Sequence, residues 1–289
     1  MSFKRKLTTG AISATLGLAL ITGGTWAAFN DVENADASVE AGTLNLDLEK
    51  VGNQPFTFEV SNLKPGDSME RKIKFVNSGS LAIKEVLMAI EEVEFTDYIP
   101  MDESDAGGKD LDTWNENDVL EFLDQFKVSV MQVGAEGGTN YPVDIIPESA
   151  EITLKDFYLA SGSVAGDSSK PASQEEINQA RSKVWNTVDN RYIDAESNRI
   201  NGSSVQNVNY AGVPVDPTDI DILKVKIEFM DNDERNPDGS FVQNKFQGDR
   251  ADIVISFEAT QWDGQEITDE DLNDDGYIES NEKAHNGEY

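Results

Sequence analysis

The stretch GTLNLDLEK, residues 42–50, sets the pattern that decides the fold. Leu44, Leu46 and Leu48 alternate with polar residues, which is the period of a strand with one buried and one solvated face. Similar patterns predict further strands at PFTFEV (55–60), MERKIKFV (69–76), KVSVMQV (127–133), DILKVKIEF (221–229) and ADIVISFEA (251–259). The segment AIKEVLMAIEEVEF (82–95) is apolar enough for a long strand, with a helix as the alternative.

Two segments in the middle of the chain have helical spacing. ENDVLEFLDQF (116–126) places its apolar residues on one helical face: Val119, Leu120, Leu123 and Phe126. SQEEINQARSKVWN begins with Ser173 and Glu176, which have the spacing of a capping box. Residues 161–170 and 186–218 are rich in Gly, Ser, Asn and Asp and are expected to be surface loops.

Strands at both ends around helical insertions predict a mainly β fold. The expected architecture is an antiparallel jelly-roll β-sandwich over residues 42–265, with helical and loop insertions, in which early strands pair with late ones. A parallel α/β sheet would need regular alternation of strands and helices, which this chain lacks. Residues 266–289 form an acidic C-terminal tail.

The first 27 residues have the order of a secretory signal peptide. The basic residues Lys4, Arg5 and Lys6 precede an apolar run, which ends in small residues at Thr25 and Ala27. We expect cleavage between Ala27 and Ala28 and secretion of the remainder. The alternative, a retained membrane anchor, is disfavoured because the apolar run is short and rich in glycine.

The charge of the chain limits its partners. Without the leader, 55 acidic residues face 20 basic ones, a net charge of −35. Such a surface repels phosphate backbones, so nucleic-acid binding is not expected, whereas cations such as calcium are attracted. The chain has no cysteine, so its core must hold without disulfides and thiol catalysis is excluded.

The residues needed for common hydrolytic sites are missing. The only histidine is His285, near the C-terminus, which excludes the two-histidine zinc-protease motif and disfavours a Ser-His-Asp triad. Carboxylates are too abundant for any pair to be singled out as a glycosidase site. The sequence therefore predicts a protein that is not an enzyme.

One metal-binding pattern stands out in the tail. DLNDDGYIESNE (271–282) matches the twelve-residue calcium loop, with glycine at position 6 for a sharp turn. The alternative is an acidic tail that matches by chance, because no paired loop is present and the flanking helices look short. The expected calcium ligands are Asp271, Asn273, Asp275, the Tyr277 carbonyl, Glu279 and Glu282.

Several segments together resemble one family. GGTWAAFND, NLKPGDS, NSGSLAIKEVLMAI, VQNKFQG, SFEATQWDG and DGYIESNEKAH are similar to the TasA biofilm-matrix proteins of spore-forming bacteria, in the camelysin group. The resemblance runs along the whole chain and is thinnest at residues 161–211. It implies a secreted jelly-roll subunit of extracellular matrix fibres, whose leader is cut by a dedicated type I signal peptidase. The alternative it leaves open is a camelysin-like secreted metalloprotease.

The resemblance also gives the new N-terminus a role. It implies head-to-tail filaments built by donor-strand exchange, with a minor assembly protein of the TapA type as a partner. Residues 28–41 would be the donor-strand arm, and Ala28, Phe29 and Val32 would be its apolar contacts. From the residues alone, an ordinary disordered terminus is the simpler interpretation.

Overall fold

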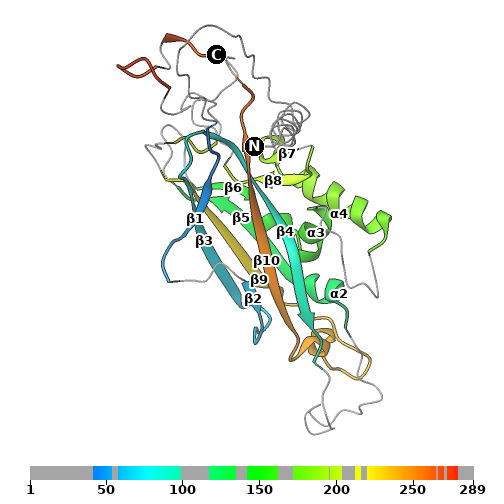
Figure 1. Cartoon of the computed structure of the whole chain (residues 1–289). Coiled ribbons are helices and arrows are strands. Elements are labelled where there is room, and N and C mark those ends of the chain that lie inside the picture. The colour runs from blue at the N-terminus through cyan, green and yellow to red at the C-terminus, as the bar shows by residue number, and fades with distance from the viewer. Residues whose placement is uncertain are drawn as a thin grey trace, which may run out of the picture. The chain divides into compact units, whose positions relative to one another are not determined.

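The fold consists of two antiparallel five-stranded sheets that pack face to face (Figure 1). It is seen in a computed structural model, and every described residue belongs to the compact unit Gly42–Tyr289. The structure describes residues 42–53, 58–98, 117–134, 142–161, 172–194, 196–203, 212–215, 220–264, 266–269 and 272–278.

Each sheet combines strands from distant parts of the chain. Sheet A has the order β1-β3-β9-β5-β6 and sheet B the order β2-β10-β4-β8-β7. The strands of sheet A are β1 (Leu46–Lys50), β3 (Ser68–Asn77), β9 (Ile222–Phe229), β5 (Phe126–Gln132) and β6 (Val143–Ile146). Those of sheet B are β2 (Phe58–Val60), β10 (Arg250–Gln261), β4 (Ile83–Thr96), β8 (Arg199–Asn201) and β7 (Ile193–Asp194).

The predicted pairing of early with late strands is confirmed. β3 pairs with β9, and β10 pairs with both β2 and β4. In β9, every second residue from Leu223 to Phe229 is buried, because alternate side chains point to the core face of the sheet. The antiparallel sandwich is therefore confirmed, while the jelly-roll winding stays an expectation from the family.

The segment 82–95, for which a helix was the alternative, is a strand. β4 extends from Ile83 to Thr96 and pairs with β10 along most of its length. Five consecutive residues, Val86 to Ile90, are buried, so the period-two pattern is lost there. Because β4 is buried on both of its faces here, its sequence lacks the alternation of a strand and is also compatible with a helix.

The helical insertions differ in part from expectation. α4 (Gln174–Thr187) begins at the predicted capping box, in which Ser173 and Glu176 exchange hydrogen bonds between side chain and backbone. α2 (Val119–Leu123) is shorter than predicted, because the chain turns at Asp124 and Phe126 already belongs to β5. A further helix, α3 (Leu154–Ala160), was not predicted and has its own capping box between Thr153 and Asp156.

The expectation that residues 186–218 form only loops was wrong. This range contains the end of α4, a 3-10 turn at Asn190–Tyr192 and the two short strands β7 and β8. β8 adds to the edge of β4 through the pairs Leu87–Asn201 and Met88–Ile200. Strands this short carry too few residues for a period to show in the sequence.

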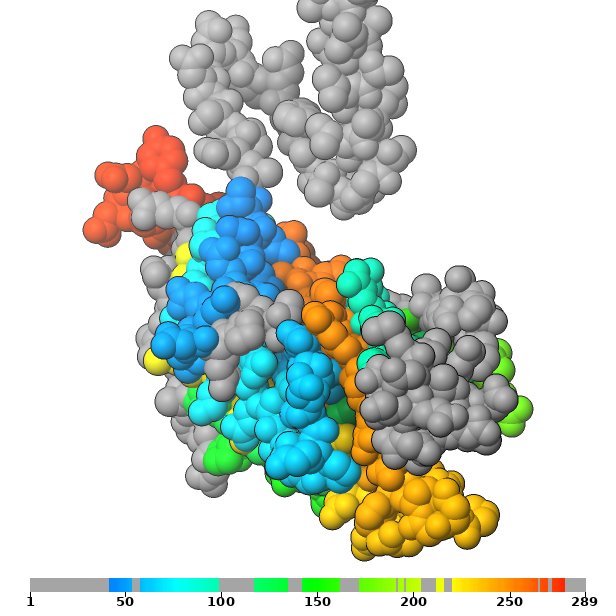
Figure 2. Space-filling model, turned by 90° about the horizontal axis from the view of Figure 1, so that it is seen from below, coloured from blue at the N-terminus to red at the C-terminus, as the bar shows by residue number. Residues whose placement is uncertain are grey.

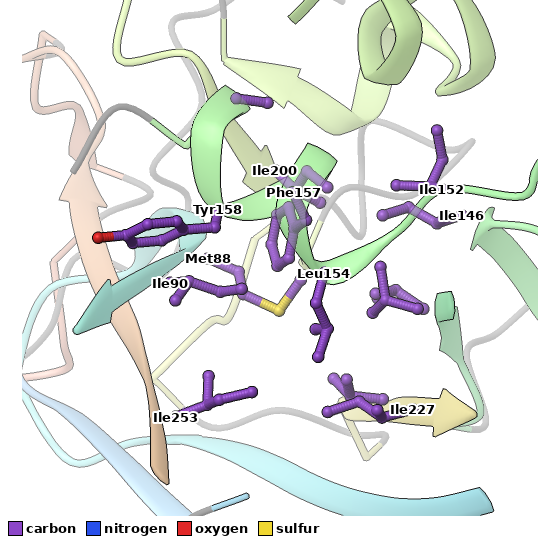
Figure 3. Close-up of a cluster of buried hydrophobic side chains, with 14 of the residues drawn as sticks. Met88, Ile90, Ile146, Ile152, Leu154, Phe157, Tyr158, Ile200, Ile227 and Ile253 are labelled. Atoms are coloured by element: carbon purple, nitrogen blue, oxygen red, sulfur yellow. The ribbon is translucent and has the colours of Figure 1, made fainter. Parts of the chain in front are cut away.

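The core lies between the two sheets and includes α3. Figure 3 shows Met88 and Ile90 of β4, Phe157 of α3, and side chains from both sheets meeting in one cluster. Helix α3 therefore fills the space between the sheets as part of the core. In the described part of the chain, no helix is both long and apolar enough to cross a membrane.

Candidate functional site: an open strand edge

In sheet B, the long strand β10 lies between β4 and the short edge strand β2, and β2 pairs with only a small part of it. β10 pairs with β4 from Arg250 to Gln261, but on its other side β2 pairs only with Ala251, Asp252 and Ile253. Among the described residues, no strand pairs with the eight residues Val254–Gln261 on that side. Residues 54–57, which precede β2, lie outside the described residues. Within the described part of the chain, the outward backbone N–H and C=O groups of Val254–Gln261 have no strand partner, and an edge of this kind can accept a further strand.

The inward side chains along this edge are only half buried. Ile255 and Phe257 pack against the core, yet both keep exposed surface, because nothing described covers them from the open side. The Phe257 ring lies 5.6 Å from the ring of Phe75 in sheet A. Leu46 and Leu48 of the edge strand β1 are also half buried, and Figure 2 shows β1 and β10 next to each other on this face. Within the described part of the chain, these half-buried side chains thus form an apolar seam between the two strands.

The outward side of the edge is only partly protected by charge. Natural proteins usually place charged residues on a free edge to prevent pairing with another chain. Here Glu258 forms an ion pair with Arg199 of β8, but Val254 is 41% exposed. The sequence predicts a strand at 251–259 but contains no signal that one side of it lacks a partner among the described residues, because pairing partners are set by the tertiary structure.

The predicted arm and cleavage site cannot be placed on this surface. Ala27, Ala28, Phe29 and Val32 lie outside the described residues. Their roles at the signal cleavage site and in the donor strand stay predictions.

The described part of the calcium loop is a tight turn. Asn273 Oδ1 accepts hydrogen bonds from the backbone N–H groups of Asp275 (3.1 Å) and Tyr277 (2.9 Å). The Tyr277 carbonyl accepts from the Asn273 N–H (2.9 Å), and Gly276 has a positive φ of 82°, as the sixth position of the pattern requires. The glycine fits the calcium pattern, whereas two of the expected ligand oxygens already serve the turn itself.

The remaining expected ligands, Asp271, Glu279 and Glu282, lie outside the described residues, as does His285. Within the described ranges, no three His, Cys, Asp or Glu side chains converge in a way that could hold a metal ion. Calcium binding by this loop stays a prediction.

We expect calcium to raise the melting temperature of the protein, and Glu282→Gln to reduce that rise. An ion that binds only the folded state stabilises it by mass action, and Glu282 would supply two oxygens. Magnesium should stabilise less, because it requires tighter octahedral geometry. The measurement is a thermal melt with calcium or magnesium at matched ionic strength. Equal shifts for both ions and both proteins would show that the loop is only an acidic turn.

The comparisons with known proteins agree on one family. The sequence profile of the family described as "Camelysin metallo-endopeptidase" matches residues 2–138 and 172–266. The chain is also 39% identical over 288 residues to the "Major biofilm matrix component" of Bacillus subtilis (strain 168), which covers 99% of this chain and 98% of that protein. Both matches include β10, whereas the family match leaves out residues 139–171, which contain β6 and α3. The chain therefore belongs to the camelysin/TasA family.

Proposed function

We propose that this protein is a secreted structural subunit of an extracellular biofilm matrix, and that its subunits join head to tail by donor-strand exchange. The relative described as a major biofilm matrix component supports the matrix role. The single structural observation that carries the assembly mechanism is the open edge at Val254–Gln261. In this mechanism, the N-terminal arm of one subunit adds a strand to the β10 edge of the next.

The dimensions of the arm and of the edge are compatible. Eight residues of an extended strand span about 27 Å, and the arm Ala28–Ser38 has eleven residues. An added antiparallel strand of that length gains about eight backbone hydrogen bonds. Backbone pairing of this kind provides affinity, while side-chain pockets provide specificity.

The apolar residues of the arm suit the two faces of the edge. Phe29 and Val32 are three positions apart, so in a regular strand they point to opposite faces. One of them would face the half-buried row of Ile255 and Phe257, and the other would lie beside the exposed Val254. This arrangement gives a reason for an apolar residue on both sides of the β10 edge.

Assembly by this route is open-ended. The donor and the acceptor lie in different parts of the same chain, so each added subunit presents a new copy of the missing element. A heterologous contact that does not close on itself makes filaments. In this scheme a TapA-type minor assembly protein is the accessory partner, and a dedicated signal peptidase releases the arm.

Processing gives a direct prediction. Protein from culture medium should begin at Ala28, because Thr25 and Ala27 are the small residues that a signal peptidase needs before its cut. Amino-terminal sequencing of the secreted protein measures this. A secreted chain that retains Met1 would contradict both the leader and the release of the arm.

The rival function is a secreted metallo-endopeptidase, which the description of the matching family favours. The two functions are separated by assaying one preparation of the chain from Ala28 in two ways. The structural function predicts filaments by electron microscopy and no chelator-sensitive cleavage of casein. Casein cleavage that a chelator abolishes, without filaments, would establish the protease instead.

A further inference from the structure

The outer faces of the two sheets carry different charge patterns. These faces point away from each other, because the sheets pack together through their core sides (Figure 1). On the outer face of sheet A, five lysines of the adjacent strands β3, β9 and β5 alternate with buried residues. They form what we call the lysine face: Lys72, Lys74, Lys127, Lys224 and Lys226. A quarter of the 20 basic residues that remain without the leader therefore lie on one face.

Within the lysine face, Lys72 differs from the other four lysines. Those four form ion pairs on the same sheet: Lys74 with Glu49, Lys127 with Glu228, Lys224 with Glu70 and Lys226 with Glu148. Lys72 is exposed, and among the described residues it forms no ion pair. Its direct cross-strand neighbour on β9 is Lys224. Like charges directly opposite each other destabilise a sheet.

The outer face of sheet B has the reverse pattern. Glu94 of β4, Asp252 of β10 and Glu59 of β2 lie directly opposite one another across three strands. Arg250 pairs with Asp252 at 2.8 Å and with Glu59 at 3.7 Å. Glu94 and Glu92 are exposed, and neither forms an ion pair with a described residue. We call Glu59, Glu92, Glu94 and Asp252 the carboxylate face.

We propose that the lysine face of one subunit binds the carboxylate face of a second copy of this chain, in a neighbouring filament. Each face keeps like charges in register, which destabilises the isolated subunit. A face of opposite charge laid against it removes that repulsion, and every copy of the chain carries both faces. The inference rests on the proposed function, because it concerns how filaments of these subunits associate side by side.

The contact is expected between filaments and not between single subunits. An exposed ion pair contributes little by itself, and two chains of net charge −35 repel each other. A filament presents the same two faces many times, so many weak contacts add up to a stable association. Because the two faces lie on opposite sides of the sandwich, each contact leaves one face of either kind free, and bundles can keep growing.

The test compares filaments of the chain from Ala28 with those of Lys72→Glu and of Glu94→Lys, at about 0.15 M salt, where the Debye length is about 8 Å. Both variants should elongate like the parent, but form about tenfold less bundled material. Low-speed sedimentation and electron microscopy measure this. Both variants should also melt slightly higher than the parent, because each reversal places opposite charges across neighbouring strands, at Lys224 and at Asp252.

Mixing the two kinds of preformed filament gives the decisive comparison. Lys72→Glu filaments keep the carboxylate face and Glu94→Lys filaments keep the lysine face, so the mixture should bundle close to the level of the parent. Net charge alone predicts a different result, because Glu94→Lys makes the chain less acidic and should then bundle more. The matched control is Asp233→Lys, an equal charge change at an exposed carboxylate after β9, which should bundle at least as much as the parent.

The proposal is overturned if parent filaments stay single, if both variants bundle like the parent, or if the mixture stays unbundled. Bundling of the parent only after an anionic polysaccharide is added would also overturn it, since that polymer would then be the partner of the lysine face. A parent that does not elongate would contradict the proposed function instead. Beads coated with the chain from Ala28 then repeat the mixing test, and beads of the two variants should clump only when mixed.

Discussion

A chain that begins at Val39, without Ala28–Ser38, is expected to fold as a monomer and to form no filaments. The compact unit begins at Gly42, so the deletion removes none of its strands. The open edge at Val254–Gln261 would remain, but no donor would be present to cover it. Circular-dichroism melts measure folding, and electron microscopy with sedimentation measures assembly, both against the chain from Ala28.

A synthetic peptide with the sequence Ala28–Ser38 sharpens this test. It should bind the truncated monomer and raise its melting temperature, because it supplies the missing strand without a subunit attached. The same peptide should slow elongation of the longer chain by occupying its edges. Filaments of ordinary appearance from the truncated chain would rule out donor-strand assembly.

Val254→Asp is expected to slow elongation about tenfold or more, which corresponds to about 1.4 kcal/mol in the strand-addition step. The arm contains Asp31, Glu33 and Asp36, so a carboxylate on the acceptor edge places like charges on neighbouring strands. Val254 is 41% exposed, so the change should leave the fold almost unaffected. Light scattering of seeded elongation measures the rate.

Ile220→Asp is the matched control for this variant. Ile220 is 47% exposed and lies just before β9 in sheet A, outside the β10 edge. It introduces the same charge in exchange for a similar apolar surface, so elongation should stay near the wild-type rate. Equal slowing by both variants would mean that net charge, and not the edge, controls assembly.

The sequence allowed the order of most elements to be predicted, but not the spatial consequences of their pairing. The strands with one solvated face, such as β3 and β9, were predicted because their alternation is regular. The predicted range of α2 was too long, because Phe126 continues the helical spacing although it lies beyond the turn, in β5. α3 was not predicted although Thr153 and Asp156 have capping-box spacing, because five of its seven residues are buried and so short a helix shows no clear apolar period.

The candidate sites show the same division. The tail pattern 271–282 is contiguous and could be seen in the sequence, and the arm was recognised from the family resemblance. The edge at Val254–Gln261 could not be predicted, because the pairing partners of a strand are set by the tertiary structure and leave no local signal in the sequence.

The central claim is that the arm of one subunit lies on the β10 edge of another, and engineered cross-linking tests it most directly. The natural chain has no cysteine, so Ser256→Cys on the edge can be mixed with a series of single-cysteine variants at Asn30, Asp31 and Val32. With the two partners labelled by different tags, oxidation of mixed filaments should give disulfide-linked heterodimers at one or two arm positions. Cross-links that form equally at every arm position, or equally well with Ile220→Cys in place of Ser256→Cys, would contradict the account.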